Sequence, residues 1–520
     1  MADPFYITTA ISYPNGKPHI GHAYEAIAAD TIARFRRAQG RDVRFITGTD
    51  EHGLKMVQTA RDAGRDTMEF ATEMSSYFKA MCETLNISND DFLRTSDPAH
   101  HAASQALWTA MEASDDLYLD RYEGWYSVRD EAFYDASELT GEGDDRRSPQ
   151  GTPVEWTAEE TWFFRLSKYQ DALLALYRDN PDFIRPESRR NEVIRFVEGG
   201  LRDLSVSRTS FDWGVKVPGS PDHVMYVWVD ALTTYMTALG YPDTAGDYAK
   251  YWPADVHLIG KDIVRFHAVY WPAFLMSAKL PLPKQIYGHG FILAKSGEKM
   301  SKSAGNSVDP MEMAERYGVD ALRYFLMREV SFGQDGSYSH EAIVNRVNSE
   351  LANSFGNLAQ RSLSMVFKNL DGVLPKFEGS ALDNELVQTV AIACQYEVPR
   401  DFDSLNFSQG IEAWMRAVYA CNQYVDQTAP WALRKTDPER MKEVLGTLFV
   451  CIRDLAIAIA PVIPESASKL LDAMGIPDTE RNQNSLNDDT WYVWLAESDF
   501  RLTQPAPIFP RLEMEEPEDG

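Results

Sequence analysis

The sequence predicts an α/β protein built on a doubly wound parallel sheet, with a segment inserted into the sheet and an α-helical bundle after it. Three observations predict this arrangement. Strand, helix and strand alternate in the first 60 residues, the alternation returns after residue 223, and helical apolar spacing replaces it from about Ser339. Because β-α-β order produces parallel strands covered by helices on both faces, the first two observations indicate the doubly wound class.

The first half of the sheet is expected within residues 1–116. Phe5–Ile11 is apolar and rich in β-branched residues, which is typical of a strand. Tyr24–Ala38 has the apolar spacing of a helix, and Gly40 would end it. Asp42–Thr47 is predicted to be the second strand.

The inserted segment is expected at residues 117–222. It contains the polar, turn-rich run Gly141–Pro149, and strand–helix alternation resumes only after it. The second half of the sheet then occupies residues 223–290. Its expected elements are strands at Val224–Val229, Val256–Ile259 and Lys284–Tyr287 and a helix at Val264–Ala278.

Residues 291–338 should connect the sheet to the bundle, with a hairpin at Phe291–Lys299 that turns at Ser296 and Gly297. From residue 339 to 520 the sequence predicts the helical bundle and a frayed acidic tail. The helical segments are expected near residues 340–369, 383–400, 408–428, 438–460 and 464–474.

The composition is that of a soluble globular protein with a large core, since hydrophobic residues make up 44% and charged residues 25% of the chain. No run of about 20 apolar residues occurs, and the N-terminus does not resemble a targeting peptide. Four cysteines without a C-x-x-C pair indicate buried thiols in a reducing cytoplasm. The net charge of −27 argues against non-specific binding of nucleic acid, so any such contact must be local.

The first candidate site is the run from Pro18 to His22, between the first strand and its helix. Doubly wound sheets bind ligands at this edge. Two imidazoles and the amides of a helix N-terminus suit phosphate oxygens, and Gly21 would let a ligand approach the backbone. Taken alone, so short a motif fits a pair of surface histidines better than a functional site.

The second candidate site is Lys299-Met300-Ser301-Lys302-Ser303, after the expected hairpin. Cations on a mobile loop suit a pyrophosphate leaving group, whose charge grows in the transition state. A solvated basic loop is the alternative interpretation.

Together, H-I-G-H and K-M-S-K-S about 280 residues later resemble the two signature motifs of class I aminoacyl-tRNA synthetases. Within that class, the chain resembles the methionyl-tRNA synthetases over nearly its whole length. The similar segments are Thr9–His22, Thr47–Gly53, Tyr226–Leu232, Ile259–Asp262 and Gly288–Gly290. The resemblance implies a Rossmann-type catalytic domain with a connective insertion, followed by an anticodon-binding bundle.

The resemblance also implies a methionine pocket of apolar and aromatic side chains, which suit a flexible, sulfur-bearing substrate. Within it, Asp50 would bind the substrate ammonium group. Leu232 departs from some relatives, which carry proline there. The residues of the pocket would be Ile11, Tyr13, Asp50, Trp228, Leu232, Tyr235 and His289.

The implied reaction has two steps and needs no protein nucleophile. The methionine carboxylate attacks the α-phosphate of ATP with the help of Mg²⁺, pyrophosphate leaves, and a terminal ribose hydroxyl of the tRNA takes the methionyl group. Catalysis then consists of positioning and charge stabilisation. By resemblance, His19, His22 and Lys302 stabilise the phosphates with help from Lys299, and Gly21, Glu25, Gly260 and Asp262 lie near the nucleotide.

In the bundle, the resemblance implies that Asn357, Arg361 and Trp431 read the anticodon. An aromatic ring can stack on an unpaired base while Asn and Arg read base edges. Without the resemblance, Trp431 would be taken as a core residue. The implied partners are methionine, ATP, and the initiator and elongator forms of tRNA(Met).

The insertion departs from relatives that carry a zinc knuckle. Ser127 and Asp130 stand where those relatives have metal ligands, and no cysteine or histidine occurs from Ala102 to Asp222. Because structural zinc sites use Cys and His, no structural zinc is expected. The additional C-terminal module of some relatives is also absent, which favours a monomer.

Two alternatives remain open: a class I synthetase for another apolar amino acid, and a non-catalytic tRNA-binding relative. The enzymes for valine, isoleucine and leucine carry a large editing insertion, for which about 105 residues are too few. A cysteine enzyme would show zinc ligands, and a general nucleotidyltransferase would not need the bundle. His19, His22 and Lys302 weigh against a non-catalytic role.

Overall fold

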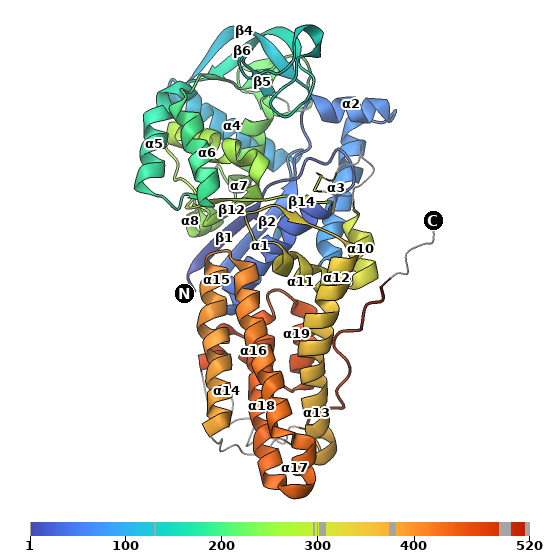
Figure 1. The fold of residues 1–520 in the computed structure, drawn as a ribbon. Coiled ribbons are helices and arrows are strands. Elements are labelled where there is room, and N and C mark those ends of the chain that lie inside the picture. Colours follow the sequence, from blue (N-terminus) through green and yellow to red (C-terminus); the bar gives the residue numbers. More distant parts are fainter. Residues whose placement is uncertain are drawn as a thin grey trace, which may run out of the picture.

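Three parts lie along one long axis in the computed structural model (Figure 1): the inserted segment at the top, the α/β part in the middle and the helical bundle below. The structure describes residues 2–128, 132–294, 297–298, 300, 308–373, 381–487 and 501–514.

The α/β part is built on a six-stranded sheet in which every neighbouring pair of strands is parallel. The order runs outward in both directions from the contact of β1 with β12, so the predicted doubly wound fold is confirmed. In sheet order the strands are β3 (Asp91–Arg94), β2 (Asp42–Thr49), β1 (Pro4–Thr9), β12 (Val256–Gly260), β13 (Ile286–His289) and β7 (Ile184–Arg185).

Helices cover both faces of this sheet because alternate side chains of each strand point to opposite faces. Phe5 and Ile7 pack into one hydrophobic cluster, and Tyr6 between them packs into another. The helices of the first face are α1 (Ile20–Ala38) and α3 (Thr67–Thr84), and those of the second are α4 (Pro98–Ala113), α7 (Val227–Thr237), α8 (Gly246–Tyr251) and α9 (Trp271–Ala278). Helix α2 (Leu54–Asp62) packs beside α3.

The insertion is built on a four-stranded antiparallel sheet and two helices. The strands, in sheet order, are β5 (Ala132–Tyr134), β4 (Leu117–Ser127), β6 (Glu155–Phe164) and β8 (Leu204–Ser205), and the helices are α5 (Gln170–Asp179) and α6 (Glu187–Glu198). A three-stranded sheet of β10 (Lys216–Val217), β11 (Ser220–Met225) and β9 (Ser207–Arg208) leads back to α7.

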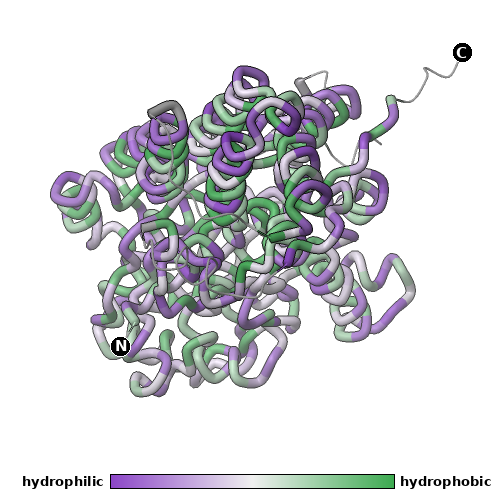
Figure 2. The backbone as a smooth tube through the Cα atoms, turned by 90° about the horizontal axis from the view of Figure 1, so that it is seen from below, coloured by the Kyte–Doolittle hydropathy of each residue, from purple (hydrophilic) through white to green (hydrophobic). Residues whose placement is uncertain are grey.

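The bundle joins the α/β part through one continuous hydrophobic cluster, in which Phe35 of α1 meets Phe402 and Phe332 meets Phe407. Figure 2 looks at the molecule from below and shows hydrophobic positions between the helices. In chain order, the helices from the end of the α/β part onward are α10 (Pro310–Tyr317), α11 (Val319–Glu329), α12 (His340–Arg346), α13 (Asn357–Asn369), α14 (Ala381–Ile392), α15 (Val398–Asp403), α16 (Phe407–Thr428), α17 (Pro430–Thr436), α18 (Pro438–Ile459) and α19 (Pro464–Ala473). Wider π turns lie at Phe266–Tyr270, Val347–Gly356 and Ala393–Glu397.

Two expectations about individual elements are corrected. The predicted strand Val224–Val229 ends at Met225, and α7 begins at Val227. The expected insertion, 117–222, is not wholly outside the sheet, since its strand β7 pairs with β13. A separate expectation, the hairpin at Phe291–Lys299, stays a prediction because three of its residues lie outside the described ones, although the Ala294 amide donates to the Glu298 carbonyl oxygen at 2.9 Å across the expected turn. The short strand β14 (Ile292–Leu293) in this segment pairs in parallel with β15 (Gly336–Ser337).

The four cysteines are buried and unpaired, as expected. Among the residues that the structure describes, no helix is long and apolar enough to span a bilayer.

Candidate active site

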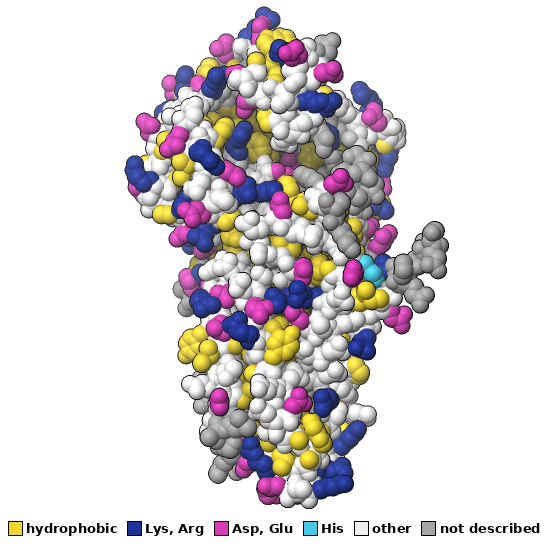
Figure 3. Space-filling model, viewed as in Figure 1, with side chains coloured by type: hydrophobic (Ala, Val, Ile, Leu, Met, Phe, Trp, Pro, Cys, Tyr) yellow, Lys and Arg dark blue, Asp and Glu magenta, His cyan; other side chains and the backbone are white. Residues whose placement is uncertain are grey.

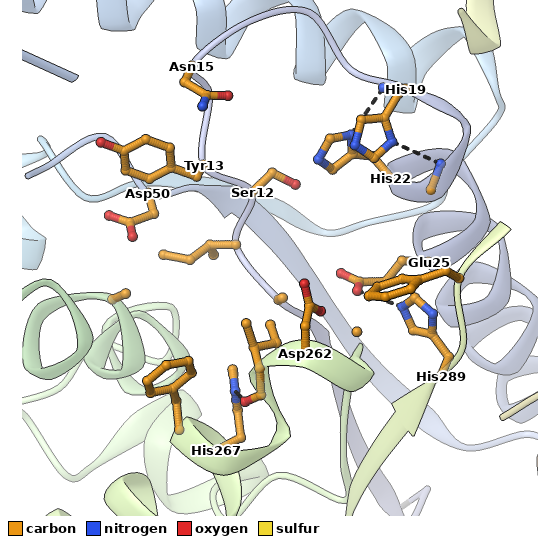
Figure 4. Close-up of a pocket in the computed structure, with 18 of the residues that line it drawn as sticks. Ser12, Tyr13, Asn15, His19, His22, Glu25, Asp50, Asp262, His267 and His289 are labelled. Carbon is orange, nitrogen blue, oxygen red and sulfur yellow. Dashed lines mark hydrogen bonds and ion pairs between the residues drawn. The ribbon is translucent and has the colours of Figure 1, made fainter. Parts of the chain in front are cut away.

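A cavity of about 460 Å³ opens at the carboxyl ends of β1, β12 and β13. Thirteen of the residues expected to bind methionine or ATP line this single cavity, many of them visible in Figure 4. These are Ile11, Tyr13, His19, Gly21, His22, Glu25, Asp50, Trp228, Leu232, Tyr235, Gly260, Asp262 and His289. Lys299 and Lys302 lie outside the described residues.

One wall, here called the phosphate side, contains the start of α1. His19 is the N-cap of this helix, and its Nδ1 accepts a hydrogen bond from the amide of Gly21 at 3.1 Å. The amide of His19 donates in turn to Nδ1 of His22 at 3.1 Å. Because Nδ1 is an acceptor in both neutral rings, each imidazole carries its proton on Nε2 and is a donor there. Two ring donors at a helix N-terminus form a site for anionic oxygens.

The two glycines expected near the nucleotide lie where a side chain would collide with a site residue. A Cβ atom on Gly21 would lie 2.9 Å from Cε1 of His19, and one on Gly260 would lie 2.8 Å from Oδ1 of Asp262. Gly260 ends β12 at the sheet edge, so its missing side chain lets Asp262 fold back toward the cavity.

His289 and Glu25 form a buried pair on the phosphate side. Nε2 of His289 lies 2.8 Å from Oε2 of Glu25, and Nδ1 lies 2.8 Å from the carbonyl oxygen of Gly290. Burial opposes protonation of His289, but the hydrogen bond to Glu25 and its charge outweigh burial and raise the pKa of the imidazole. Both ring nitrogens of His289 therefore already have protein partners.

The opposite wall, here called the aromatic side, contains Trp228, Tyr235, Phe266 and His267. Trp228 and Phe266 stack with ring centroids 3.9 Å apart and planes 9° apart. The Tyr235 hydroxyl lies 2.7 Å from Nε2 of His267, whose Nδ1 lies 3.0 Å from the carbonyl oxygen of Ile263. Burial lowers the pKa of His267 to about 4, so the ring is neutral at pH 7. Nδ1 then donates to Ile263, and Nε2 accepts from Tyr235.

Phe266 and His267 are site residues that the sequence did not single out. They lie in the π turn Phe266–Tyr270, which a regular helical period does not predict. Such turns often occur at functional sites. The only signal in the sequence was their position about one helical turn after the Ile259–Asp262 motif.

The tip of the bundle carries the other candidate residues, far from the cavity (Figure 1). Trp431 of α17 is 47% exposed, and the guanidinium carbon of Arg361 lies 5.4 Å from the centre of its ring. Asn357, one turn before Arg361 on α13, is also exposed. Arg434 and Lys435 lie in the last turn of α17, and Figure 3 shows several Lys and Arg side chains at this tip. The structure therefore brings the three expected residues to one exposed region and excludes a core role for Trp431.

A hydroxyl cluster in the insertion contains Ser127, a position at which no metal ligand was expected. The Thr152 hydroxyl lies 2.7 Å from those of both Ser127 and Ser148, and all three side chains are buried. Asp130 lies outside the described residues. Hydrogen bonds thus connect the end of β4 with the turn at residues 148–152 that precedes β6.

The chain matches two family models along its length. Residues 5–363 match the class I tRNA synthetases (M), and residues 378–519 match the anticodon-binding domain of methionyl tRNA ligase.

Curated relatives and solved structures agree with these matches. The methionine–tRNA ligase of Brucella suis is 56% identical over 510 residues, which cover 98% of both chains. That of Mycobacterium tuberculosis is 54% identical over 523 residues, which cover 99% of both chains. A crystal structure of the Mycobacterium tuberculosis methionyl-tRNA synthetase bound by methionyl-adenylate superimposes with a TM-score of 0.92, at 53% identity, over 98% of this chain and 100% of that one.

Proposed function

The chain belongs to the methionine–tRNA ligase family of class I aminoacyl-tRNA synthetases, and we propose that its cavity joins methionine to ATP and passes methionine to the terminal adenosine of tRNA(Met). The observation that carries the proposal is one cavity with a donor-rich phosphate side and an apolar aromatic side. Methionyl-adenylate offers both kinds of group, since its apolar methionine side chain is joined through a charged phosphate to adenosine. Because the chain belongs to this family, the two alternatives, a synthetase for another amino acid and a non-catalytic relative, explain it less well.

On the aromatic side, the methionine side chain would lie among Ile11, Trp228, Leu232 and Tyr235, which offer apolar area and favourable sulfur contacts. Asp50, with Tyr13 beside it in Figure 4, would take the ammonium group. We propose His267 as the histidine of this pocket in place of His289, because His267 lies on the aromatic side with Tyr235, whereas His289 lies on the phosphate side with Glu25.

On the phosphate side, Nε2–H of His19 and of His22 would donate to the phosphate oxygens as negative charge grows on them. Donors already aimed at developing charge need no reorganisation during the reaction. Glu25, Asp262, Gly21 and Gly260 would surround the nucleotide, and Lys299 and Lys302 are proposed to stabilise pyrophosphate as it leaves. The α-phosphate and the methionine carboxylate would meet between the two sides, so catalysis is chiefly positioning.

No group of three or more His, Cys, Asp or Glu side chains is placed to hold a metal ion within the described part of the chain. We propose that Mg²⁺ enters on the phosphates of ATP and that no structural zinc is bound. The buried Ser127–Thr152–Ser148 cluster supports the second proposal, since hydroxyls are not the ligands of structural zinc.

At the other end, Asn357, Arg361 and Trp431 are proposed to read the anticodon of both initiator and elongator tRNA(Met). The enzyme is proposed to work as a monomer in the cytoplasm, where aminoacyl-tRNA is used. The proposed catalytic domain consists of residues 1–116 and 223–290 together with β7. The rest of 117–222 is proposed to be the connective insertion, 291–338 the connecting region, and 339–520 the anticodon-binding domain.

Amino-acid-dependent ATP–pyrophosphate exchange with each of the twenty amino acids tests the substrate. Methionine alone should support strong exchange. Stronger exchange with leucine, valine or isoleucine would contradict the assignment.

A further inference from the structure

The buried carboxylate of Asp230 lies behind the cavity and connects helix α7 with the segment that contains Asp50. Asp230 of α7 is fully buried, with Oδ2 2.5 Å from Nδ1 of His52 and Oδ1 2.5 Å from Nε2 of His100 on α4. None of these three side chains lines the cavity, so none of them is placed to touch a substrate there.

Both ends of this contact lie next to residues that do line the cavity. Asp230 sits on α7 between Trp228 and Leu232, and His52 follows Asp50 by two residues. The Asp230–His52 contact therefore joins the helix that would hold the methionine side chain to the segment that would hold its ammonium group.

The segment around Asp50 is also fixed from its other side. The carboxylate of Glu51 accepts from Nε of Arg94 at 2.7 Å and from the Ser96 hydroxyl at 2.5 Å, and Trp213 donates from Nε1 to the Glu51 carbonyl oxygen at 2.6 Å. These contacts tie the segment to β3 and to the chain before α7. The contact of His52 adds the direct tie to α7 itself.

The chemistry of Asp230 indicates alignment more than stability. Burial would raise its pKa, but the charges and hydrogen bonds of His52 and His100 outweigh burial and hold the pKa of Asp230 well below its ordinary value. Buried ion pairs usually stabilise a protein no more than well-packed apolar side chains of similar size would. The carboxylate of Asp230 instead orients its neighbours, since each of its oxygens holds one imidazole at hydrogen-bond distance.

We propose that Asp230 is a positioning residue for methionine binding. Asp230 acts through His52 and thereby holds Asp50 at a fixed distance from Trp228 and Leu232. The ammonium group and the side chain of methionine can then be bound at the same time. This inference rests on the proposed function of the cavity.

The test compares Asp230→Asn and Asp230→Ala with the wild type in methionine-dependent ATP–pyrophosphate exchange. A displacement of about 1 Å can cost up to roughly a hundredfold in such sites, so we expect the methionine KM to rise roughly tenfold in Asp230→Asn and further in Asp230→Ala. The KM for ATP should stay within about twofold of the wild type, because the phosphate side is fixed by other contacts.

Asp116→Asn is the matched control. Asp116 is equally buried, and Lys168, Tyr169 and Ser277 hold its carboxylate at 2.6, 2.5 and 2.7 Å, outside the cavity lining. Its loss should lower the thermal midpoint without changing the methionine KM.

An unchanged methionine KM in both Asp230 variants would overturn the proposal, as would an equal rise in Asp116→Asn or a parallel rise in the KM for ATP. If Asp230→Ala does not fold, Asp230→Asn and His52→Gln decide by the same measurements. Wild-type exchange is measured first, since its absence would contradict the proposed function and not the role of Asp230.

Discussion

Trp431→Ala separates the two ends of the molecule. The ring is 47% exposed and lies under Arg361 at the tip of the bundle. Base–aromatic stacking contributes about 1–3 kcal/mol, so its loss should reduce kcat/KM for tRNA roughly 5- to 150-fold. ATP–pyrophosphate exchange needs no tRNA and should stay at the wild-type level.

The exposure of Trp431 also limits the expected loss of stability. A buried Trp truncated to Ala costs about 3–5 kcal/mol. With about half of the side chain already in water, the cost should be about half of that, and losing the cation–π contact with Arg361 adds about 0.5–1 kcal/mol. The thermal midpoint should therefore fall by only a few degrees.

Tyr419→Ala is the control, since Tyr419 is 49% exposed on α16 and lies outside the proposed anticodon region. Aminoacylation, exchange and thermal midpoint are measured on both variants and on Arg361→Ala. The reasoning is refuted if aminoacylation by Trp431→Ala is untouched, if exchange falls in parallel with it, or if Tyr419→Ala loses as much.

Three further predictions concern the catalytic end. His22→Ala removes a donor aimed at the phosphates and should raise the free-energy barrier to adenylate formation, measured in single turnovers, by about 2–4 kcal/mol with little change in methionine affinity. An unchanged rate would exclude this role for His22. His267 has a pKa of about 4 when folded and about 6.5 when unfolded, so the unfolded chain takes up the proton first as pH falls. The free energy of unfolding should thus decrease between pH 6.5 and 4 by up to about 3 kcal/mol, and His267→Asn should show a shallower slope in pH-dependent unfolding. Elemental analysis of the purified protein should find no stoichiometric zinc, and about one zinc per chain would contradict the role given to the Ser127 cluster.

The sheet could be predicted because its central strands are buried on both faces and therefore appear in the sequence as short apolar, β-branched runs. The bundle could be predicted because its helices bury one face, which leaves a helical period in the sequence. Helix α7 could not, since nine of its eleven residues are buried, from Val227 to Met236. A helix that is buried all round has no apolar stripe, and its β-branched residues then look like a strand.

The candidate site was predictable as a set of motifs but not as a set of contacts. Residues next to β1 and β12 converge because parallel strands end at one edge. Which histidine faces the aromatic side depends on partners that are distant in the chain: Glu25 engages His289 from 264 residues away, and Tyr235 engages His267. Such pairings leave no local pattern.

The exposure of Trp431 could not be predicted from the sequence either, because an aromatic residue in the first turn of a helix fits a core position or a surface position equally well. The structure turns it outward through Ala429, whose φ of 42° ends α16, and Pro430, which starts α17 in a new direction. A left-handed alanine costs conformational energy, and it is retained here at the turn that presents the ring.

The overall charge of −27 does not oppose RNA binding at this tip. Charges in physiological salt are screened over about 8 Å. Helix α18 alone has 22 residues, or about 33 Å at 1.5 Å per residue, so acidic groups of the α/β part lie several screening lengths away, and only the acidic groups of the bundle near the tip can oppose an RNA there. What an RNA meets at the tip is set by nearby groups: Arg361, Arg434 and Lys435 supply positive charge beside the exposed ring. Local charge and stacking, rather than net charge, therefore decide which RNA is held there.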